Sequence, residues 1–300
     1  MQVITQSFSG GKNNIAVIFT HSRATLLEES IVSFLEAIGS ESWSLLIVQQ
    51  AGSLEINQIL KKYEQKITLL MRFNDIGKGV LGNINYSRLL GTSIAFDQFS
   101  AELVLGIEED TKISKDSLVF IEQMQLRYGF NSRFRGVNLC SRLPLNPDLM
   151  NTYSILRFGL SGQAGAINLK TWQRINLHNL LKDIGEEEWA SRIEPIMKTG
   201  FVIHPNNSRL FDQGWGGYSS AELGPDSESF VTQHASWVGD YLPTEKSYVR
   251  QDMPGVWRHD AIFYRPWHNI YFDLRPKKAA RFFYKFWKFI RLPKIEPERH

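Results

Sequence analysis

The sequence is poor in cysteine and in long hydrophobic runs. Its single cysteine, Cys140, excludes an internal disulfide framework and is typical of a reducing compartment. No stretch approaches the roughly 18 apolar residues that a membrane-spanning helix requires, and the first residues lack the basic and then apolar pattern of a signal peptide. We therefore expect a cytoplasmic protein.

A large excess of charge of one sign is also missing. Lys and Arg number 34 and Asp and Glu number 31, which gives a formal net charge of +3. This balance does not create the overall positive field that nucleic acids attract, so we expect no nucleic-acid partner. With 300 residues, 43% of them hydrophobic, the chain is long enough for a large buried core.

Several catalytic signatures are absent. There is no glycine-rich loop followed by lysine, no nucleophile-elbow serine and no recognisable Cys/His pair, which argues against kinases, serine hydrolases and thiol enzymes. The histidines of the second half show no paired metal-ligand spacing, so a zinc site is not expected.

Short apolar runs alternate with helical patterns over the first half of the chain. Strands are predicted at residues 15–20, 43–48, 67–71 and 103–107, separated by amphipathic helices. This alternation predicts an α/β fold, in which a mostly parallel sheet is flanked by helices. Ligands bind such sheets beyond the carboxyl ends of the strands, where Arg23 and Gln50 fall.

The second half is less regular. A strand is predicted at residues 135–140 and a helix at about 169–181, with glycine clusters around them. We expect a nucleotide-binding half at about 14–130 and an acceptor-side half at about 131–240. Residues 241–300 are predicted to form a C-terminal extension.

Three consecutive carboxylates, Glu108, Glu109 and Asp110, follow the predicted strand at 103–107. Carboxylates at the exit of a buried strand repel one another, so they require a cation or hydroxyl donors nearby. Mg²⁺ or Mn²⁺ would supply that charge and bridge to the phosphates of a substrate. The alternative is a solvated acidic loop.

Two later segments are further candidates. Glu188 precedes Trp189, and a carboxylate beside an aromatic ring can deprotonate an acceptor hydroxyl, although residues 186–188 also suit the exposed first turn of a helix. Arg209 follows a predicted strand and a polar loop, where a guanidinium can bind a phosphate. A surface arginine is the alternative.

In their order, these motifs resemble the β-1,2-N-acetylglucosaminyltransferases, a glycosyltransferase family with the GT-A fold, over about residues 14–240. Residues 47–52 (IVQQAG) are similar to a family strand that ends in a Gln-Asp pair reading the uracil, with Gln50 in place of the aspartate. The acidic triplet is similar to the family's Glu-Asp-Asp motif, with Asp110 as the metal ligand. The glycine turn at 159–162 is similar to the one that shapes the family's donor-sugar pocket.

The resemblance also implies roles in the second half. Residues 187–189 are similar to the family's Asp-Asp-Trp, which makes Glu188 the catalytic base, and residues 205–209 are similar to its Pro-x-x-Ser-Arg stretch. The donor-binding residues expected from the motifs and the resemblance are Arg23, Gln50, Glu108, Glu109, Gly162 and Arg209.

The resemblance therefore implies an inverting glycosyltransferase that uses Mn²⁺ or Mg²⁺ and a nucleoside diphosphate sugar, with UDP as the expected nucleotide. A glycan or glycolipid is the expected acceptor, because a membrane-bound acceptor would explain the basic aromatic segment at 275–291, and the lack of a signal anchor suggests bacterial surface polysaccharide synthesis. Two alternatives stay open. One is an inactive carbohydrate-binding scaffold on the same fold, and the other is a sugar-nucleotide nucleotidyltransferase, which usually has a glycine-rich basic loop where His21, Ser22 and Arg23 stand here.

Residues 275–291 (RPKKAARFFYKFWKFIR) combine basic and aromatic residues at helical spacing. Such a helix can lie on an anionic membrane surface, so we expect peripheral attachment to the inner face of the membrane. The same helix can also pack on the protein's own core. Binding of single-stranded nucleic acid is the less favoured alternative, because the rest of the chain has no basic excess.

Overall fold

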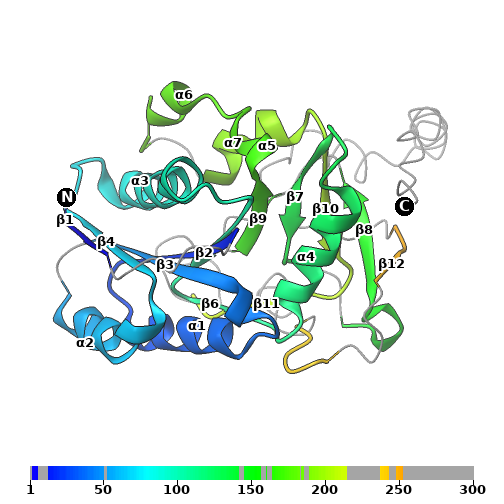
Figure 1. Cartoon of the computed structure of the whole chain (residues 1–300), viewed down its shortest axis with the longest axis horizontal. Helices are drawn as coiled ribbons and strands as arrows, with labels where there is room; N and C mark the ends of the chain where they lie inside the picture. Colours follow the sequence, from blue (N-terminus) through cyan, green and yellow to red (C-terminus); the bar gives the residue numbers. More distant parts are fainter. Residues whose placement is uncertain are drawn as a thin grey trace, which may run out of the picture.

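A computed structural model of the chain describes residues 2–5, 13–50, 53–141, 145–156, 160, 164–182, 184–185, 189–214, 237–242 and 248–252. Within them, a ten-stranded sheet is covered by helices on both faces (Figure 1). This arrangement confirms the predicted α/β class. None of the helices in these ranges is long and apolar enough to cross a membrane.

Four neighbouring strands of the sheet form a parallel block. The strands of the whole sheet are β1 (Gln2–Thr5), β2 (Asn14–Thr20), β3 (Trp43–Gln50), β4 (Leu69–Phe73), β5 (Leu103–Glu108), β7 (Phe134–Asn138), β8 (Thr152–Leu156), β9 (Ala164–Asn168), β10 (Phe201–Pro205) and β12 (Val249–Arg250). The spatial order is β1-β4-β3-β2-β5-β9-β7-β10-β8-β12. Neighbouring strands from β4 to β5 are parallel, whereas β9 is antiparallel to both β5 and β7.

The central strands are apolar because both faces of the sheet are covered. Along β2, Ile15 and Val17 belong to one hydrophobic cluster, whereas Ala16 and Ile18 belong to the other. A strand with side chains alternating between two buried faces reads as a continuous apolar run, which is the signal that predicted this strand.

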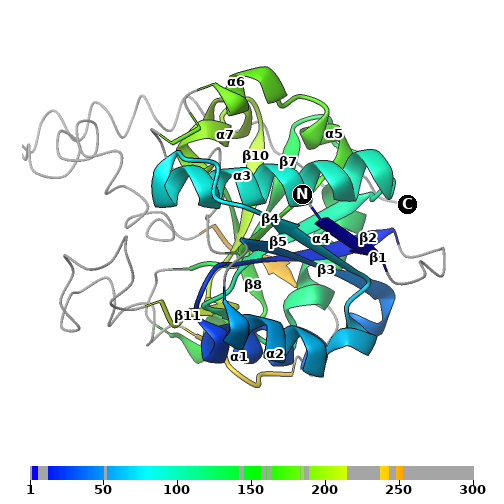
Figure 2. The same cartoon turned by 90° about the vertical axis from the view of Figure 1, so that its left-hand side faces the viewer.

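The helices form one layer on each face (Figure 2). They are α1 (Ala24–Glu36), α2 (Leu54–Lys62), α3 (Gly79–Ser93), α4 (Ser117–Tyr128), α5 (Leu169–Trp172), α6 (Leu177–Leu181) and α7 (Trp189–Met197). Helices α1, α2 and α4 share one hydrophobic cluster, and α3, α5, α6 and α7 share the other. Gly91 lets α3 approach the sheet closely, because a Cβ there would collide with Val17 and Val48.

The irregular second half differs in detail from the prediction. The glycine cluster around residue 165 suggests turns, but residues 164–168 form β9. Gly165 lies inside the sheet, where it pairs with Gly106 of β5. The predicted helix at 169–181 is divided into α5 and α6. The sheet also extends past residue 240 through β12, whereas the helix predicted at 275–291 lies outside the described residues.

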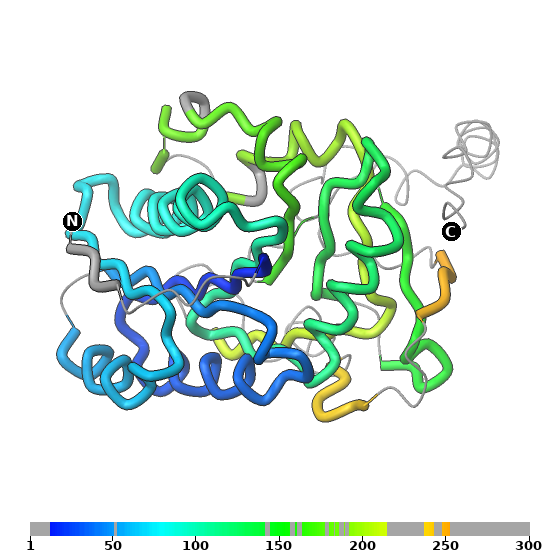
Figure 3. The backbone as a smooth tube through the Cα atoms, viewed as in Figure 1, coloured from blue at the N-terminus to red at the C-terminus, as the bar shows by residue number. Residues whose placement is uncertain are grey.

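A second, two-stranded sheet connects distant parts of the chain. Strand β6 (Thr111–Ile113) follows β5 directly, and it pairs antiparallel with β11 (Leu210–Asp212). In Figure 3 the chain near β11 returns to the segment that follows β5. We call residues 110–113 and 210–214 the acidic ribbon, because they bring a carboxylate of the second half to the acidic triplet.

Candidate active site

The candidate site lies where β2 and β5 end side by side. Phe19 of β2 is in register with Glu108 of β5. The spatial order of the parallel block is β4-β3-β2-β5. From β2 the chain adds β3 and β4 on one side and then crosses to add β5 on the other side, so the order of strands reverses between β2 and β5. In open α/β sheets, ligands bind at the carboxyl ends of strands at such a reversal. The prediction that Arg23 and the acidic triplet share one edge of the sheet is therefore confirmed.

Glu109 is buried and receives three donors from the end of β2. The Thr20 hydroxyl and the backbone N–H of His21 each donate to its Oε2 at 2.7 Å, and Nε of Arg23 lies 3.0 Å from Oε1. A second nitrogen of Arg23, Nη2, pairs with Oδ2 of Asp110 at 2.7 Å. The charge that the triplet requires is therefore supplied in part by Arg23, one of the predicted donor-binding residues.

Glu108 has a counterion that the sequence analysis missed. Arg88 of α3 forms an ion pair with Glu108, and its guanidinium also lies over the ring of Phe19, 5.6 Å from the ring centre. Burial raises the pKa of Glu108 to about 7; Arg88 opposes the rise, and the neighbouring Asp110 and Asp212 add to it. The signal in the sequence was that Arg88 is the one charged residue of α3, and a buried arginine requires an acidic partner.

The acidic ribbon adds the fourth carboxylate. Gln213 donates its backbone N–H to the carbonyl of Asp110 at 2.7 Å, and this fixes the end of β11 beside the triplet. Asp212 accepts the N–H of Gly214 at 2.8 Å. Gly214 approaches so closely that a Cβ there would collide with Oδ2 of Asp110.

The fit to a divalent ion rests on Asp110. Its Oδ1 is buried and has no hydrogen-bond partner within the described residues, and burial raises the pKa of this carboxyl although Arg23 opposes the rise. Over the same residues, no group of three or more Asp, Glu, His or Cys side chains is arranged to hold a metal. Mg²⁺ commonly takes only one or two carboxylates and completes its shell with substrate phosphates and water, so Asp110 fits this mode of binding.

The remaining predicted residues fall at or beyond the edge of the described chain. Gln50 ends β3, the strand beside β2, and so lies at the same edge of the sheet. Gly162 and Glu188 lie outside the described residues. Trp189, which follows Glu188, lines a small pocket together with Arg88 and Gly106. The chain therefore passes close to the Glu108–Arg88 pair as it enters α7.

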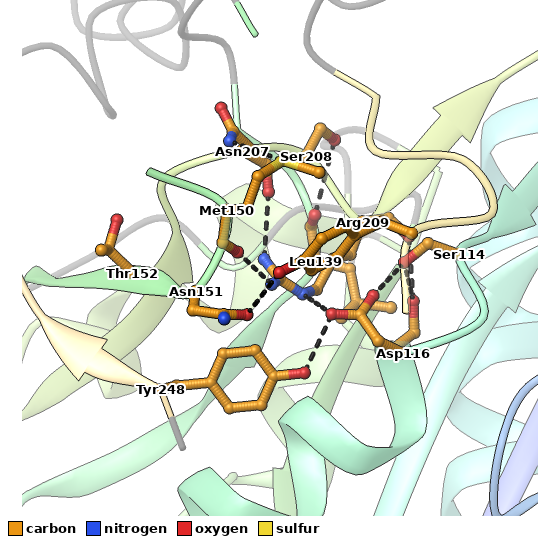
Figure 4. Close-up of polar contacts among 12 residues, drawn as sticks. Ser114, Asp116, Leu139, Met150, Asn151, Thr152, Asn207, Ser208, Arg209 and Tyr248 are labelled. Atoms are coloured by element: carbon orange, nitrogen blue, oxygen red, sulfur yellow. Dashed lines mark hydrogen bonds and ion pairs between the residues drawn. The ribbon is translucent and has the colours of Figure 1, made fainter. Parts of the chain in front are cut away.

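Arg209 is buried inside the protein and has a protein counterion. Its side chain is 0% exposed, and its Nε pairs at 2.9 Å with Asp116, which is also 0% exposed (Figure 4). The other guanidinium nitrogens donate to the backbone carbonyls of Asn207 and Met150. The structure therefore corrects the expectation that Arg209 reaches a phosphate, and it corrects the alternative of a surface arginine as well.

The Arg209–Asp116 pair supports the acidic ribbon. Asp116 accepts hydrogen bonds from the hydroxyls of Ser114 and Tyr248. The carbonyl of Arg209 accepts the N–H of Ser114 at 2.9 Å, which continues the pairing of β6 with β11. The guanidinium also lies over the rings of Phe120 and Tyr248 at 4.6 and 5.0 Å. This network fixes β6, which begins directly after Asp110, and β11, which ends at Asp212.

Comparison with known proteins gives similarity only to solved structures. No protein-family model and no curated protein matches the sequence. S. aureus TarS 1-349 in complex with UDP-GlcNAc is 12% identical with a TM-score of 0.46, over 70% of this chain and 61% of that one. The mannosyltransferase PcManGT from Pyrobaculum calidifontis, in complex with GDP-Man and Mn²⁺, is 13% identical with a TM-score of 0.39, over 56% of this chain and 48% of that one. At TM-scores of this size, the assignment of a function depends on this chain's own residues.

Proposed function

We propose that the protein is a metal-dependent, inverting glycosyltransferase of the GT-A type, which uses a nucleoside diphosphate sugar. The observation that carries the proposal is the buried carboxylate of Asp110, located where the order of the parallel strands reverses. Its Oδ2 pairs with Arg23, whereas its Oδ1 has no hydrogen-bond partner within the described residues. Such a position suits a nucleotide, and such a carboxylate suits an ion that is shared with a diphosphate. The resemblance of the triplet to the Glu-Asp-Asp motif of N-acetylglucosaminyltransferases agrees with this proposal.

The residues at this edge divide the binding of the donor among them. Asp110 would hold Mn²⁺ or Mg²⁺, which when bound neutralises charge on the leaving diphosphate. Arg23 is partly exposed beside Asp110, so its guanidinium can donate to phosphate oxygens. Gln50, at the end of β3, can hydrogen-bond the edge of a uracil with its side-chain amide. Glu108 and Glu109 hold Arg88 and Arg23 in place.

The transfer itself needs a base. In this proposal the Glu188 carboxylate removes the proton of an acceptor hydroxyl, and the hydroxyl oxygen attacks the anomeric carbon from the side opposite the diphosphate. The bond to the diphosphate breaks as the new glycosidic bond forms, so the configuration inverts. The proposed acceptor is a glycan or glycolipid of bacterial surface polysaccharide synthesis. The basic aromatic segment 275–291 would hold the enzyme at the inner face of the membrane.

The proposal is tested with a panel of sugar nucleotides, each with Mn²⁺ or with EDTA. We expect one donor to raise the melting temperature and to release nucleoside diphosphate only when the metal is present. Stabilisation by a donor without any release, in the presence of glycan acceptors, would favour the inactive carbohydrate-binding scaffold. A lack of response to every donor would contradict the transferase assignment.

Changing Glu188 to Gln should leave the Kd for the donor unchanged and lower kcat by about 100- to 10,000-fold, because the amide cannot accept the proton of the acceptor. Isothermal titration with the donor and a rate assay with the acceptor measure the two effects separately. Glu55→Gln, an exposed glutamate of α2, is the matched control and should change neither value. An unchanged kcat in Glu188→Gln would remove Glu188 as the base.

A further inference from the structure

Positive charge gathers at the edge of the sheet where β7 begins. Arg133 directly precedes this strand and Arg135 is its second residue, while Arg174 follows α5 in the chain. Helix α5 packs on the same strand, because the hydroxyl of Thr171 donates to the carbonyl of Phe134 at 3.5 Å. Burial lowers the pKa of Arg135, and the positive charges of Arg174 and Arg133 lower it further. Arg135 is therefore close enough to both of the other guanidiniums to be repelled by them.

Arg135 is a buried cation that meets only neutral groups. It is 3% exposed, and its guanidinium donates to the hydroxyl of Thr199 at 3.0 Å and to nearby backbone carbonyls. Arg133 and Arg174 form no ion pair with a carboxylate of the described residues either. Buried or clustered charge is normally compensated by charge of the other sign. An anion from outside the described residues would supply it.

The acidic side chains of this edge have other partners. Asp97 accepts a hydrogen bond from the indole N–H of Trp172 at 3.1 Å, and Glu102 accepts one from the side-chain amide of Asn13 at 3.1 Å. Glu194 of α7 pairs with the lysine four residues later. None of these carboxylates forms an ion pair with the three arginines, so the two outer arginines remain available to an external anion.

Large apolar side chains are exposed beside these cations. Leu126 and Phe130, near the end of α4, are 76% and 71% exposed. The ammonium of Lys170 lies 5.6 Å from the ring centre of Phe130 and donates to the carbonyl of Gly129. Aromatic and aliphatic side chains beside lysine and arginine are typical of surfaces that meet lipid headgroups. We call Leu126, Phe130, Arg133, Lys170 and Arg174 the basic edge.

The basic edge lies away from the candidate site. Strands β5 and β7 are both antiparallel to β9, so they run in the same direction. The candidate site follows the end of β5, whereas the basic edge surrounds the beginning of β7. Figure 2 shows this separation, with α5 at the right and β11 at the left. A partner bound at the basic edge therefore does not cover the proposed donor site.

We propose that the basic edge docks on an anionic lipid surface. A soluble anion would compensate the arginines but would leave Leu126 and Phe130 in water. A lipid surface meets both needs, since its phosphate groups pair with the cations while the apolar side chains enter the headgroup region. The inference goes beyond the attachment proposed for residues 275–291, because it uses a folded face of the protein and requires neither that segment nor sugar transfer.

The test measures cosedimentation of the full chain with vesicles of phosphatidylcholine, with and without phosphatidylglycerol. We expect binding only when the anionic lipid is present. Arg133→Gln combined with Arg174→Gln should weaken this binding about 10- to 30-fold, because each basic residue near an anionic surface contributes about fivefold. Leu126→Ser should weaken it about fivefold or more, since the serine does not enter the headgroup region.

Matched controls come from a distant part of the surface. Lys61→Gln combined with Lys66→Gln also removes two exposed cations, and Leu54→Ser replaces a leucine that is 80% exposed at the start of α2. Both controls should bind the vesicles as the unchanged protein does, because these residues lie outside the basic edge.

The outcomes separate this inference from the proposed function. Equal vesicle affinity in the double arginine variant and the unchanged protein would overturn it, and so would an equal loss in the double lysine control. Binding of a single-stranded oligonucleotide but not of vesicles, through the same arginines, would replace the lipid by a nucleic acid. Vesicle binding that depends on the basic edge, in a protein that releases no nucleoside diphosphate from any donor, would support the surface and contradict only the transferase. If the double arginine variant does not fold, as judged by circular dichroism, Lys170→Gln and Leu126→Ser decide the question.

Discussion

Replacing Arg209 by methionine is expected to lower the free energy of unfolding by about 3–5 kcal/mol, because it leaves the buried carboxylate of Asp116 without its counterion. Both side chains are 0% exposed. Water therefore cannot take the place of the lost guanidinium. The hydroxyls of Ser114 and Tyr248 remain as donors to Asp116, but they carry no charge. Equilibrium unfolding in urea, followed by circular dichroism, measures the loss.

Two further variants give this prediction its control. Arg250→Met removes the arginine of an Arg–Asp pair at the surface, where Asp252 is 49% exposed, and should cost no more than about 1 kcal/mol. Asp116→Leu combined with Arg209→Met removes both buried charges, and it should be less destabilising than the sum of the two single changes. A small effect of Arg209→Met alone would contradict the interpretation of Arg209 as a structural residue.

Changing Asp110 to Asn should reduce the rate of sugar transfer by at least about 100-fold while the fold is kept. The isosteric amide removes the negative charge that holds the cation, and a cation contributes several kcal/mol to a reaction of this type, where each 1.36 kcal/mol is a factor of ten. The fold is expected to persist because Arg23 keeps its pair with Glu109, which also holds the end of β2. Initial rates at saturating donor and Mn²⁺ measure the effect.

Asp240→Asn, at an 86% exposed aspartate that pairs with Lys115, serves as the control, and it should transfer sugar at the rate of the unchanged protein. The Asp110→Asn protein should also lose the stabilisation that Mn²⁺ gives in the presence of the donor. Full activity in this variant would remove Asp110 as the metal ligand, and it would direct attention to Arg23 as the cation that meets the diphosphate without a metal.

The part of the site that was predictable depends on local patterns. Strands β2 and β5 are apolar runs that end in polar residues, and parallel strands end at the same edge of a sheet. Arg23 and the triplet could therefore be placed together without knowledge of any contact. In the structure they form an ion-paired cluster, with Arg23 bound to Glu109 and Asp110.

The parts that were missed or misjudged depend on contacts between distant segments. Arg209 stands in a stretch of asparagine and serine, which is typical of an exposed loop, but its burial comes from Asp116, Phe120 and Tyr248. Asp212 has no motif of its own and reaches the site only through the pairing of β11 with β6. β9 was missed because its glycine content suggests turns, although Gly165 pairs with Gly106 inside the sheet.

The position of β9 also has a consequence for how the protein is made. β9 lies between β5 and β7, pairs with both, and is synthesised after both of them. Until β9 emerges from the ribosome, β5 presents an apolar edge with unpaired backbone groups on one side, which is a template for pairing with other chains. A fragment that stops after α4 would carry most of the proposed nucleotide-binding residues, yet we expect it to aggregate. The segments before and after α4 are thus one unit in biosynthesis.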